Sequence, residues 1–300
     1  MSDIKLFQIT SSKVTELEGK SVTVEKSLQS LIEKHLESFL GVTFLASEYS
    51  TGTKHSGRID TLGIDENNCP VIIEYKRSTN ENVINQGLYY LDWLLDHKAE
   101  FQLLVMQKKN KSISENIEWD NARLICIAGD YTKYDTYAIE QINRNIEMIR
   151  YRTYKDLLLF ELVNTISAEK SEKKTKQGAK QKYTTVRELL NKSSTSVKDL
   201  FEGIKSYLLA LGDDVQMKEL LYYFAFKRIK NFASVEIHPQ TSTIVVYVNL
   251  APWEFNQEKG FIRDVSKVGH LGTGNVEIKI KDLSDFEKSK QYILKSYEFS

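Results

Sequence analysis

Val71-Ile72-Ile73-Glu74-Tyr75-Lys76 decides the fold of the N-terminal half, together with Gly57-Arg58-Ile59-Asp60 before it. Residues 58–64 and 71–77 are both typical of β-strands. Asp65-Glu66-Asn67-Asn68 between them has the composition of a tight turn. The sequence therefore predicts a β-hairpin.

A turn centred near Asn67 places Asp60 opposite Glu74, and strand alternation puts Ile72, Glu74 and Lys76 on one face. The second strand begins apolar on both faces, which predicts an interior strand whose carboxylate needs a partner or a metal. Oxygen ligands of this kind suit Mg²⁺ or Mn²⁺. Asp60 and Glu74 are therefore predicted to hold the cation, and Lys76 to orient or help deprotonate an attacking water. The alternative is a surface hairpin with cross-strand ion pairs.

Two predicted helices flank this hairpin. Thr79-Asn80 can cap a helix over residues 81–97, on which Gln86 and Tyr90 lie four residues apart. A helix over residues 24–40 carries an apolar stripe, and Glu25 lies on its inward face, whereas Glu33 and Glu37 point away. The alternative for Glu25 is an acidic residue in the first turn, favoured by the helix dipole.

These motifs resemble the PD-(D/E)XK nuclease superfamily, and most closely a NucS-like (EndoMS-like) nuclease domain. The resemblance implies a restriction-endonuclease-like α/β core, a mixed sheet flanked by helices, that hydrolyses DNA with a divalent cation. The catalytic residues that it implies are Asp60, Glu74, Lys76, Gln86 and Glu25. In this family the glutamine helps to hold the catalytic lysine or a phosphate. Gln86 and Tyr90 can also be ordinary polar positions of a half-buried helix.

Contacts with nucleic acid are predicted at four positions. Arg58 is a candidate phosphate contact, with a local acid as the alternative partner, and Tyr90 is a second candidate beside it. In the C-terminal half, Lys227 and Arg228 lie close in sequence to Phe232, a combination that suits phosphate contact with base or sugar packing. The alternative is a solvated strand end.

Composition is consistent with a cytoplasmic enzyme. The chain has 300 residues, is 41% hydrophobic, and balances 41 basic with 41 acidic residues. Two cysteines make no disulfide framework, which favours a reducing compartment. No apolar run approaches the roughly 20 residues of a membrane-spanning helix. We therefore expect DNA as the partner and no membrane association, and leave a homodimer open.

Three segments are predicted along the chain. Residues 1–165 form the nuclease-like domain, 166–183 a polar, lysine-rich linker, and 184–300 a smaller α+β domain. The first domain is expected to contain strands near 101–107 and 122–128 and a helix near 135–147. In the second, strands are expected near 220–228, 231–238, 242–250 and 275–281, with helices over 196–211 and 285–298.

The C-terminal half resembles an uncharacterised bacterial domain that accompanies this nuclease-like domain in a family labelled "predicted transport protein". The residues that carry this resemblance include Tyr222, Arg263-Asp264-Val265 and Gly269-His270-Leu271-Gly272. Transport has no support from a spanning segment or a small-molecule motif. The sequence thus predicts a metal-dependent DNA endonuclease whose C-terminal half selects the substrate. The alternative is a nuclease-fold nucleic-acid or protein-binding module with weak or no turnover.

Overall fold

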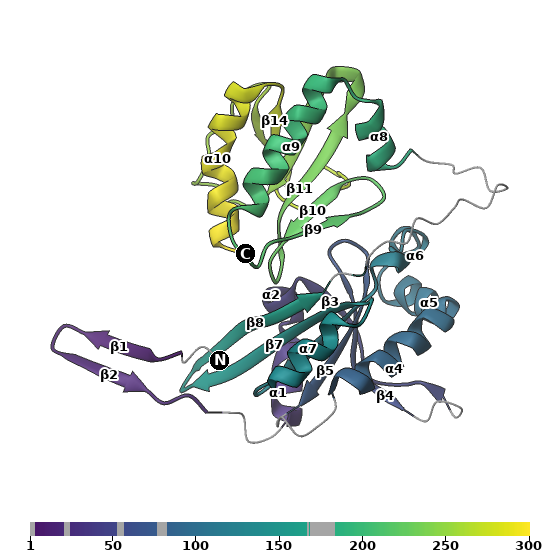
Figure 1. Cartoon of the computed structure of the whole chain (residues 1–300), viewed down its shortest axis with the longest axis vertical. Helices are drawn as coiled ribbons and strands as arrows, with labels where there is room; N and C mark the ends of the chain where they lie inside the picture. The colour runs from purple at the N-terminus through teal and green to yellow at the C-terminus, as the bar shows by residue number, and fades with distance from the viewer. Residues whose placement is uncertain (1–3, 21–24, 53–56, 77–82, 167, 169–183) are drawn as a thin grey trace. The chain divides into compact units, whose positions relative to one another are not determined.

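The computed structural model describes residues 4–20, 25–52, 57–76, 83–166, 168 and 184–300. The chain divides into two compact units, Met1–Glu172 and Lys173–Ser300 (Figure 1). Of the predicted linker, only residues 166 and 168 are described, so the rest of that prediction lies outside the described residues.

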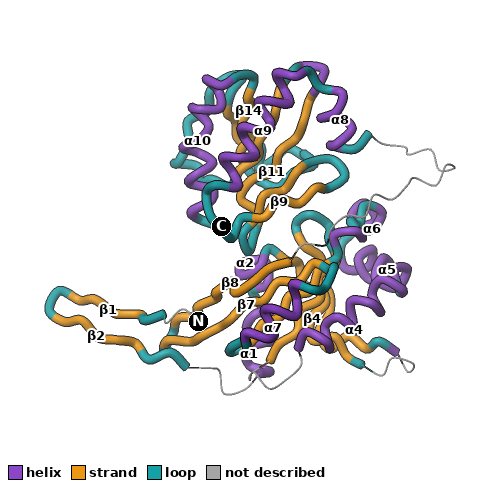
Figure 2. Tube along the Cα trace, in the orientation of Figure 1, coloured by secondary structure: helices purple, strands orange, loops and turns teal. Residues whose placement is uncertain are grey.

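Unit 1 is built on a six-stranded mixed sheet with helices packed on it, as the sequence predicts (Figure 2). The strand order is β3-β4-β5-β6-β7-β8; β5, β6 and β7 are parallel to one another and the other neighbours are antiparallel. The strands are β3 (Val42–Ser50), β4 (Arg58–Asp65), β5 (Pro70–Lys76), β6 (Arg123–Ala128), β7 (Asn145–Tyr154) and β8 (Leu157–Ile166). Because β5 lies inside the sheet, it is apolar on both faces up to Glu74.

The helices cover this sheet through apolar side chains. One core includes Leu62 and Ile72 from the sheet and the buried residues of α4, whereas α1 contacts β4 and β5 through other side chains. The helices are α1 (Glu25–Lys34), α2 (Leu36–Leu40), α4 (Val83–Asp96), α5 (Lys98–Lys108), α6 (Lys111–Glu115) and α7 (Lys133–Glu140). A separate hairpin of β1 (Leu6–Thr10) and β2 (Lys13–Leu17), which the sequence analysis does not predict, precedes them.

The turn between β4 and β5 forms for local reasons. The Asp65 carboxylate accepts hydrogen bonds from the backbone N–H groups of Asn67 and Cys69, both at 2.9 Å, and Asn68 takes a positive φ of 61°. The other Asp65 oxygen lies 3.1 Å from Nε of Arg123 on β6. This chemistry fixes the predicted antiparallel pairing, in which Thr61 faces Ile73.

Three predicted elements of unit 1 need correction. Residues 101–107 are helical within α5, because Phe101 and Val105, four residues apart, bury one helical face. The helix expected over 24–40 is interrupted at His35 and forms α1 and α2. The helix expected over 135–147 ends at Glu140, and β7 begins at Asn145.

Unit 2 is an α+β domain with a six-stranded antiparallel sheet in the order β13-β14-β12-β11-β10-β9. Its strands are β9 (Gln216–Glu219), β10 (Phe224–Lys227), β11 (Asn231–His238), β12 (Thr243–Val248), β13 (Ile262–Asp264) and β14 (Val276–Ile280). The helices α8 (Val186–Lys192), α9 (Thr195–Leu209) and α10 (Leu283–Glu298) pack on one core. The strand predicted over 220–228 is present as β10, which begins only at Phe224, and β9 and α8 are additions to the predicted elements.

Every helix that the structure describes is too short or too polar to cross a lipid bilayer. Cys69 and Cys126 are both buried and carry free thiols. Burial raises the pKa of both thiols, which makes them poor nucleophiles.

Candidate functional site

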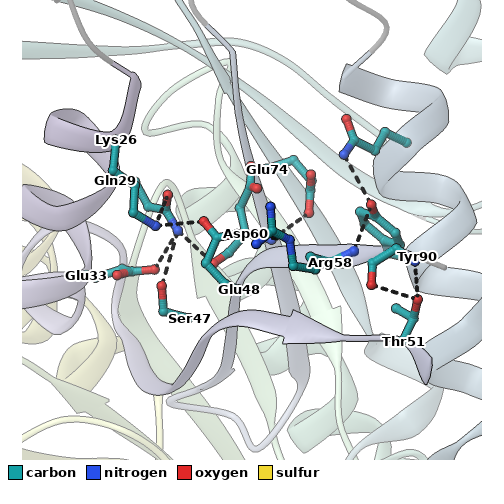
Figure 3. A network of polar contacts seen from close by, with 12 residues as sticks. Lys26, Gln29, Glu33, Ser47, Glu48, Thr51, Arg58, Asp60, Glu74 and Tyr90 are labelled. Carbon is teal, nitrogen blue, oxygen red and sulfur yellow. Dashed lines mark hydrogen bonds and ion pairs between the residues drawn. The ribbon is translucent and has the colours of Figure 1, made fainter. Parts of the chain in front are cut away.

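The hairpin β4–β5 brings Asp60 and Glu74 together. The backbone N–H of Asp60 donates to Oε1 of Glu74 at 3.1 Å, and the backbone N–H of Tyr75 donates to Oδ2 of Asp60 at 3.0 Å. Each carboxylate therefore accepts a hydrogen bond from the strand that carries the other. Figure 3 shows the two side chains at the centre of a polar network.

Glu74 is a buried carboxyl group with a strongly raised pKa. Its side chain is 0% exposed, and its Oε2 has no hydrogen-bond partner among the described residues. Burial, and next to it the Asp60 carboxylate, raise the pKa of Glu74 to about 9, although the Lys76 ammonium acts in the opposite direction. Glu74 is therefore protonated and uncharged at neutral pH when no cation is bound beside it.

An open carboxylate oxygen beside a second carboxylate fits a hard divalent cation. Among the described residues no group of three His, Cys, Asp or Glu side chains gathers at one point. The protein side chains that fit a cation here are thus Asp60 and Glu74. This small ligand set suits Mg²⁺ or Mn²⁺, because Mg²⁺ sites commonly keep several waters.

Lys76 is the last residue of β5 and lies two positions beyond Glu74, so both side chains leave the same face of the strand. From this position its ammonium lowers the pKa of Glu74, against the effect of burial. The Lys76 carbonyl accepts from the backbone N–H of Gly129 at 3.3 Å, which fixes the end of β5 against the segment that follows β6.

Gln86 and Tyr90, on α4, fix the beginning of β4. The Tyr90 hydroxyl accepts from the backbone N–H of Arg58 at 3.3 Å and from Nε2 of Gln86 at 3.2 Å. A Cβ added at Gly57 would lie 2.5 Å from Cε1 of Tyr90, so the ring packs directly on this backbone. Tyr90 is buried, and its contacts place Gln86 and Tyr90 at the beginning of the strand that carries Asp60.

On α1, the residue that reaches the site is Gln29, which the sequence analysis does not single out. Its Nε2 donates to the Asp60 carbonyl at 2.8 Å and lies 3.0 Å from Oε1 of Glu33. Glu33 in turn accepts from the Thr61 hydroxyl at 2.6 Å. It therefore faces β4, and the prediction that Glu33 points away is wrong. Glu25 begins α1, but its side chain lies outside the described residues. The sequence signal for Gln29 is its spacing of four residues from both Glu25 and Glu33.

Glu48 on β3 is a second residue that the sequence analysis misses. It takes a positive φ of 50°, a conformation that non-glycine residues adopt rarely and that is common near functional sites. Its carboxylate accepts from Lys26 at 2.7 Å and lies 3.5 Å from Nε of Arg58 (Figure 3). The hydrogen bond from Lys26 lowers the pKa of Glu48. Arg58, whose side chain is 71% exposed, thus pairs with a local acid, which is the alternative given for it from the sequence.

In unit 2 the predicted basic cluster is only partly at the surface. Lys227 is 3% exposed, and Phe232 belongs to the hydrophobic core. A surface contact with phosphate and base through these two side chains is therefore incompatible with this fold. Arg228 is half-buried, bonds Oδ2 of Asp214 at 2.7 Å, and lies over the Tyr297 ring.

The comparisons with known proteins agree with this division of the chain. Residues 186–300 carry a domain that matches the family described as "Domain of unknown function (DUF5655)". The whole chain is similar to a protein of Haemophilus influenzae (strain ATCC 51907 / DSM 11121 / KW20 / Rd) named "Uncharacterized protein", with 26% identity over 295 residues, covering 95% of this chain and 96% of the relative. No solved structure matches the chain significantly. The mixed α/β unit with its paired carboxylates is thus joined to a DUF5655 unit, and neither match carries a function.

Proposed function

We propose that this protein is a metal-dependent DNA endonuclease that hydrolyses phosphodiester bonds in unit 1. The observation that carries the proposal is the buried, unpartnered Oε2 of Glu74 beside Asp60, with Lys76 on the same strand face. A fold that leaves a carboxylate oxygen open at this cost is typical of a cation site. The PD-(D/E)XK resemblance, and its NucS-like branch, supports the same reaction.

The proposal assigns a role to each residue. Asp60 and Glu74 would hold Mg²⁺ or Mn²⁺, which supplies Lewis acidity and lowers the pKa of bound water. Lys76 orients the attacking water and steadies negative charge on the phosphate. Arg58, exposed at the rim, contacts a neighbouring phosphate, and Glu25 adds a further acid from α1.

Gln86 and Tyr90 act in this proposal as positioning residues, since both fix the beginning of β4. Unit 2 selects the substrate, and the enzyme works in the cytoplasm. The buried thiols and the lack of a spanning helix in the described part of the chain are consistent with this location.

The test is a panel of DNA substrates incubated with the full chain and Mg²⁺ or Mn²⁺. The panel contains single strands, blunt duplexes, mismatched duplexes, flaps and branched molecules of one sequence set. We expect divalent-dependent cleavage of at least one substrate and none in EDTA.

Single substitutions then separate chemistry from folding. Asp60→Ala, Glu74→Ala and Lys76→Ala should each lower the cleavage rate by about 100-fold or more, because each removes a group that serves the cation or the water. Asp92→Asn changes an exposed carboxylate on α4 and should cleave like the wild type. Circular dichroism checks that the variants are folded. Retained cleavage by folded Lys76→Ala protein would contradict the assignment, and tight DNA binding without any cleavage would favour a binding module.

A further inference from the structure

Two large aromatic side chains are exposed at one end of unit 2. Trp253, in the segment after β12, is 86% exposed, the highest value among the exposed large hydrophobic residues of the described chain. Phe299, which follows α10, is 72% exposed. Scattered apolar side chains are normal on a surface, but large aromatic side chains exposed on neighbouring segments are typical of a binding site.

The segment that carries Trp253 is held in place by hydrogen bonds. The backbone N–H of Ala251 donates to Oε2 of Glu254 at 2.6 Å, and the Glu254 N–H donates to the Ala251 carbonyl at 3.0 Å. Nζ of Lys295, in the last turn of α10, donates to the Glu254 carbonyl at 3.2 Å. The backbone N–H of Phe299 bonds the Lys295 carbonyl, so both exposed rings lie on segments joined at Lys295.

The turn between β10 and β11 adds cations to the same end of the unit. The Arg228 guanidinium lies 4.8 Å from the centre of the Tyr297 ring, near the end of α10. The Ser296 hydroxyl donates to the Phe232 carbonyl and accepts from the Asn249 N–H, which joins α10 to β11 and to the end of β12. The α10 terminal surface is defined here as Trp253, Phe299, Tyr297, Arg228 and Lys295.

We propose that the α10 terminal surface binds unpaired nucleobases by stacking, with an adjoining phosphate near Lys295. This inference rests on the proposed nuclease function and names its substrate class: DNA with a single-stranded region. Every base has a π-face, so an aromatic side chain can stack on it without sequence preference. The Lys295 ammonium donates to a neutral carbonyl, which does not cancel its charge, whereas Arg228 is paired with Asp214 at 2.7 Å and stacks on Tyr297. Lys295 is therefore the cation of this surface that can pair with a phosphate, and aromatic rings bordered by an ammonium group suit a polyanion better than an apolar protein surface.

The experiment uses the full chain with Asp60→Asn, so that bound DNA is not cut. Oligothymidine of about 12 nucleotides is the probe, compared with a blunt duplex of the same length. Of the three tryptophans in the chain, Trp93 is buried and Trp119 is half-buried, so emission from Trp253 is identified by its loss in Trp253→Phe protein and by acrylamide quenching compared between the two proteins. We expect single-stranded DNA to quench Trp253 emission.

Affinities of matched variants complete the test. Trp253→Ala should weaken binding of oligothymidine by about tenfold, Trp253→Phe should retain most of the affinity, and binding of the blunt duplex should not change. Leu283→Ala is the control, because Leu283 is 69% exposed at the opposite end of α10 and should have no effect. Unchanged oligothymidine affinity in Trp253→Ala protein would overturn the proposal. So would a dimer of the free protein that protects Trp253 from acrylamide and dissociates in Trp253→Ala protein.

The two proposals can fail independently. Divalent-dependent cleavage by the wild type without quenching of Trp253 would leave the nuclease standing and remove the stacking surface. Quenching of Trp253 by oligothymidine and weakened binding in Trp253→Ala protein, with no cleavage by the wild type, would support the stacking surface and contradict the nuclease.

Discussion

In the folded chain, the protonated form of the Glu74 carboxyl group is favoured over the ionised form. Burial and the Asp60 carboxylate raise its pKa from 4.5 to about 9, so between these two values the folded state binds a proton that the unfolded chain has released. Its contribution to stability is fully present below about pH 4.5 and is lost as the pH rises toward 9. A divalent cation at Asp60 and Glu74 would remove this loss.

Glu74→Gln should therefore stabilise the protein in EDTA. A glutamine Oε1 can still accept from the Asp60 N–H, while its amide nitrogen can donate to the Asp60 carboxylate, and no charge is buried. We expect a small difference in the free energy of unfolding at about pH 5 and a gain of roughly 2–4 kcal/mol at about pH 9. Thermal denaturation across this pH range measures it. A gain that does not grow with pH would show that Glu74 is ionised without penalty.

Binding of the cation should release a proton from Glu74. At about pH 7.5 the carboxyl group is protonated in the free protein and must ionise to coordinate Mg²⁺ or Mn²⁺. Titration calorimetry with Mn²⁺ in buffers of different ionisation enthalpy should show about one proton released per ion. Apparent affinity should rise with pH up to about 9, and Glu74→Gln should abolish the proton release. Affinity that is independent of pH would place the cation away from Glu74.

At the scale of the elements, β4 is positioned from two helices. Gln29 on α1 bonds the carbonyl of Asp60, and Tyr90 on α4 bonds the N–H of Arg58, so the backbone on either side of Ile59 is fixed. Neither contact touches the side chain of Asp60. The orientation of this carboxylate should therefore depend on residues that take no part in the chemistry.

Gln29→Met tests this dependence. The substitution keeps the length of the side chain but leaves the Asp60 carbonyl and Glu33 without the Gln29 amide, which should cost about 1–3 kcal/mol of unfolding free energy. We expect the maximal cleavage rate to fall at least tenfold, with a smaller change in substrate affinity. Ser30→Ala, at an exposed position of α1, is the matched control for both denaturation and cleavage kinetics. A loss of stability with unchanged cleavage would limit Gln29 to a structural role.

Elements formed by local interactions are the ones that the sequence predicts best. The β4–β5 hairpin follows from alternation and from the turn chemistry of Asp65, both of which act within a few residues. The segment that forms α5 is a short apolar run, which fits a strand or a helix equally until the packing of Phe101 and Val105 decides. Gln29 and Glu48 could not be assigned to the site, because their contacts depend on how distant elements meet.

For the whole molecule, the decisive feature is that each unit has its own hydrophobic core. One core gathers buried side chains from β4 to β7 with α4 and α5, and the other gathers those of α9, α10 and the second sheet. Two separate cores predict that each unit folds by itself. Ala168, whose N–H bonds Oδ1 of Asn145, still belongs to unit 1.

A chain that ends at Ala168 should therefore fold cooperatively, bind Mn²⁺ with the same release of a proton, and keep Asp60 and Glu74 in place. It should lose DNA affinity or selectivity, because the unit proposed to select the substrate is absent. Calorimetry, circular dichroism and the same DNA panel measure these properties beside the full chain.

A chain of residues 184–300 should bind oligothymidine with quenching of Trp253 but cleave nothing. Undiminished substrate preference in the shortened N-terminal chain would place selection within unit 1 and leave the DUF5655 unit to bind a protein partner.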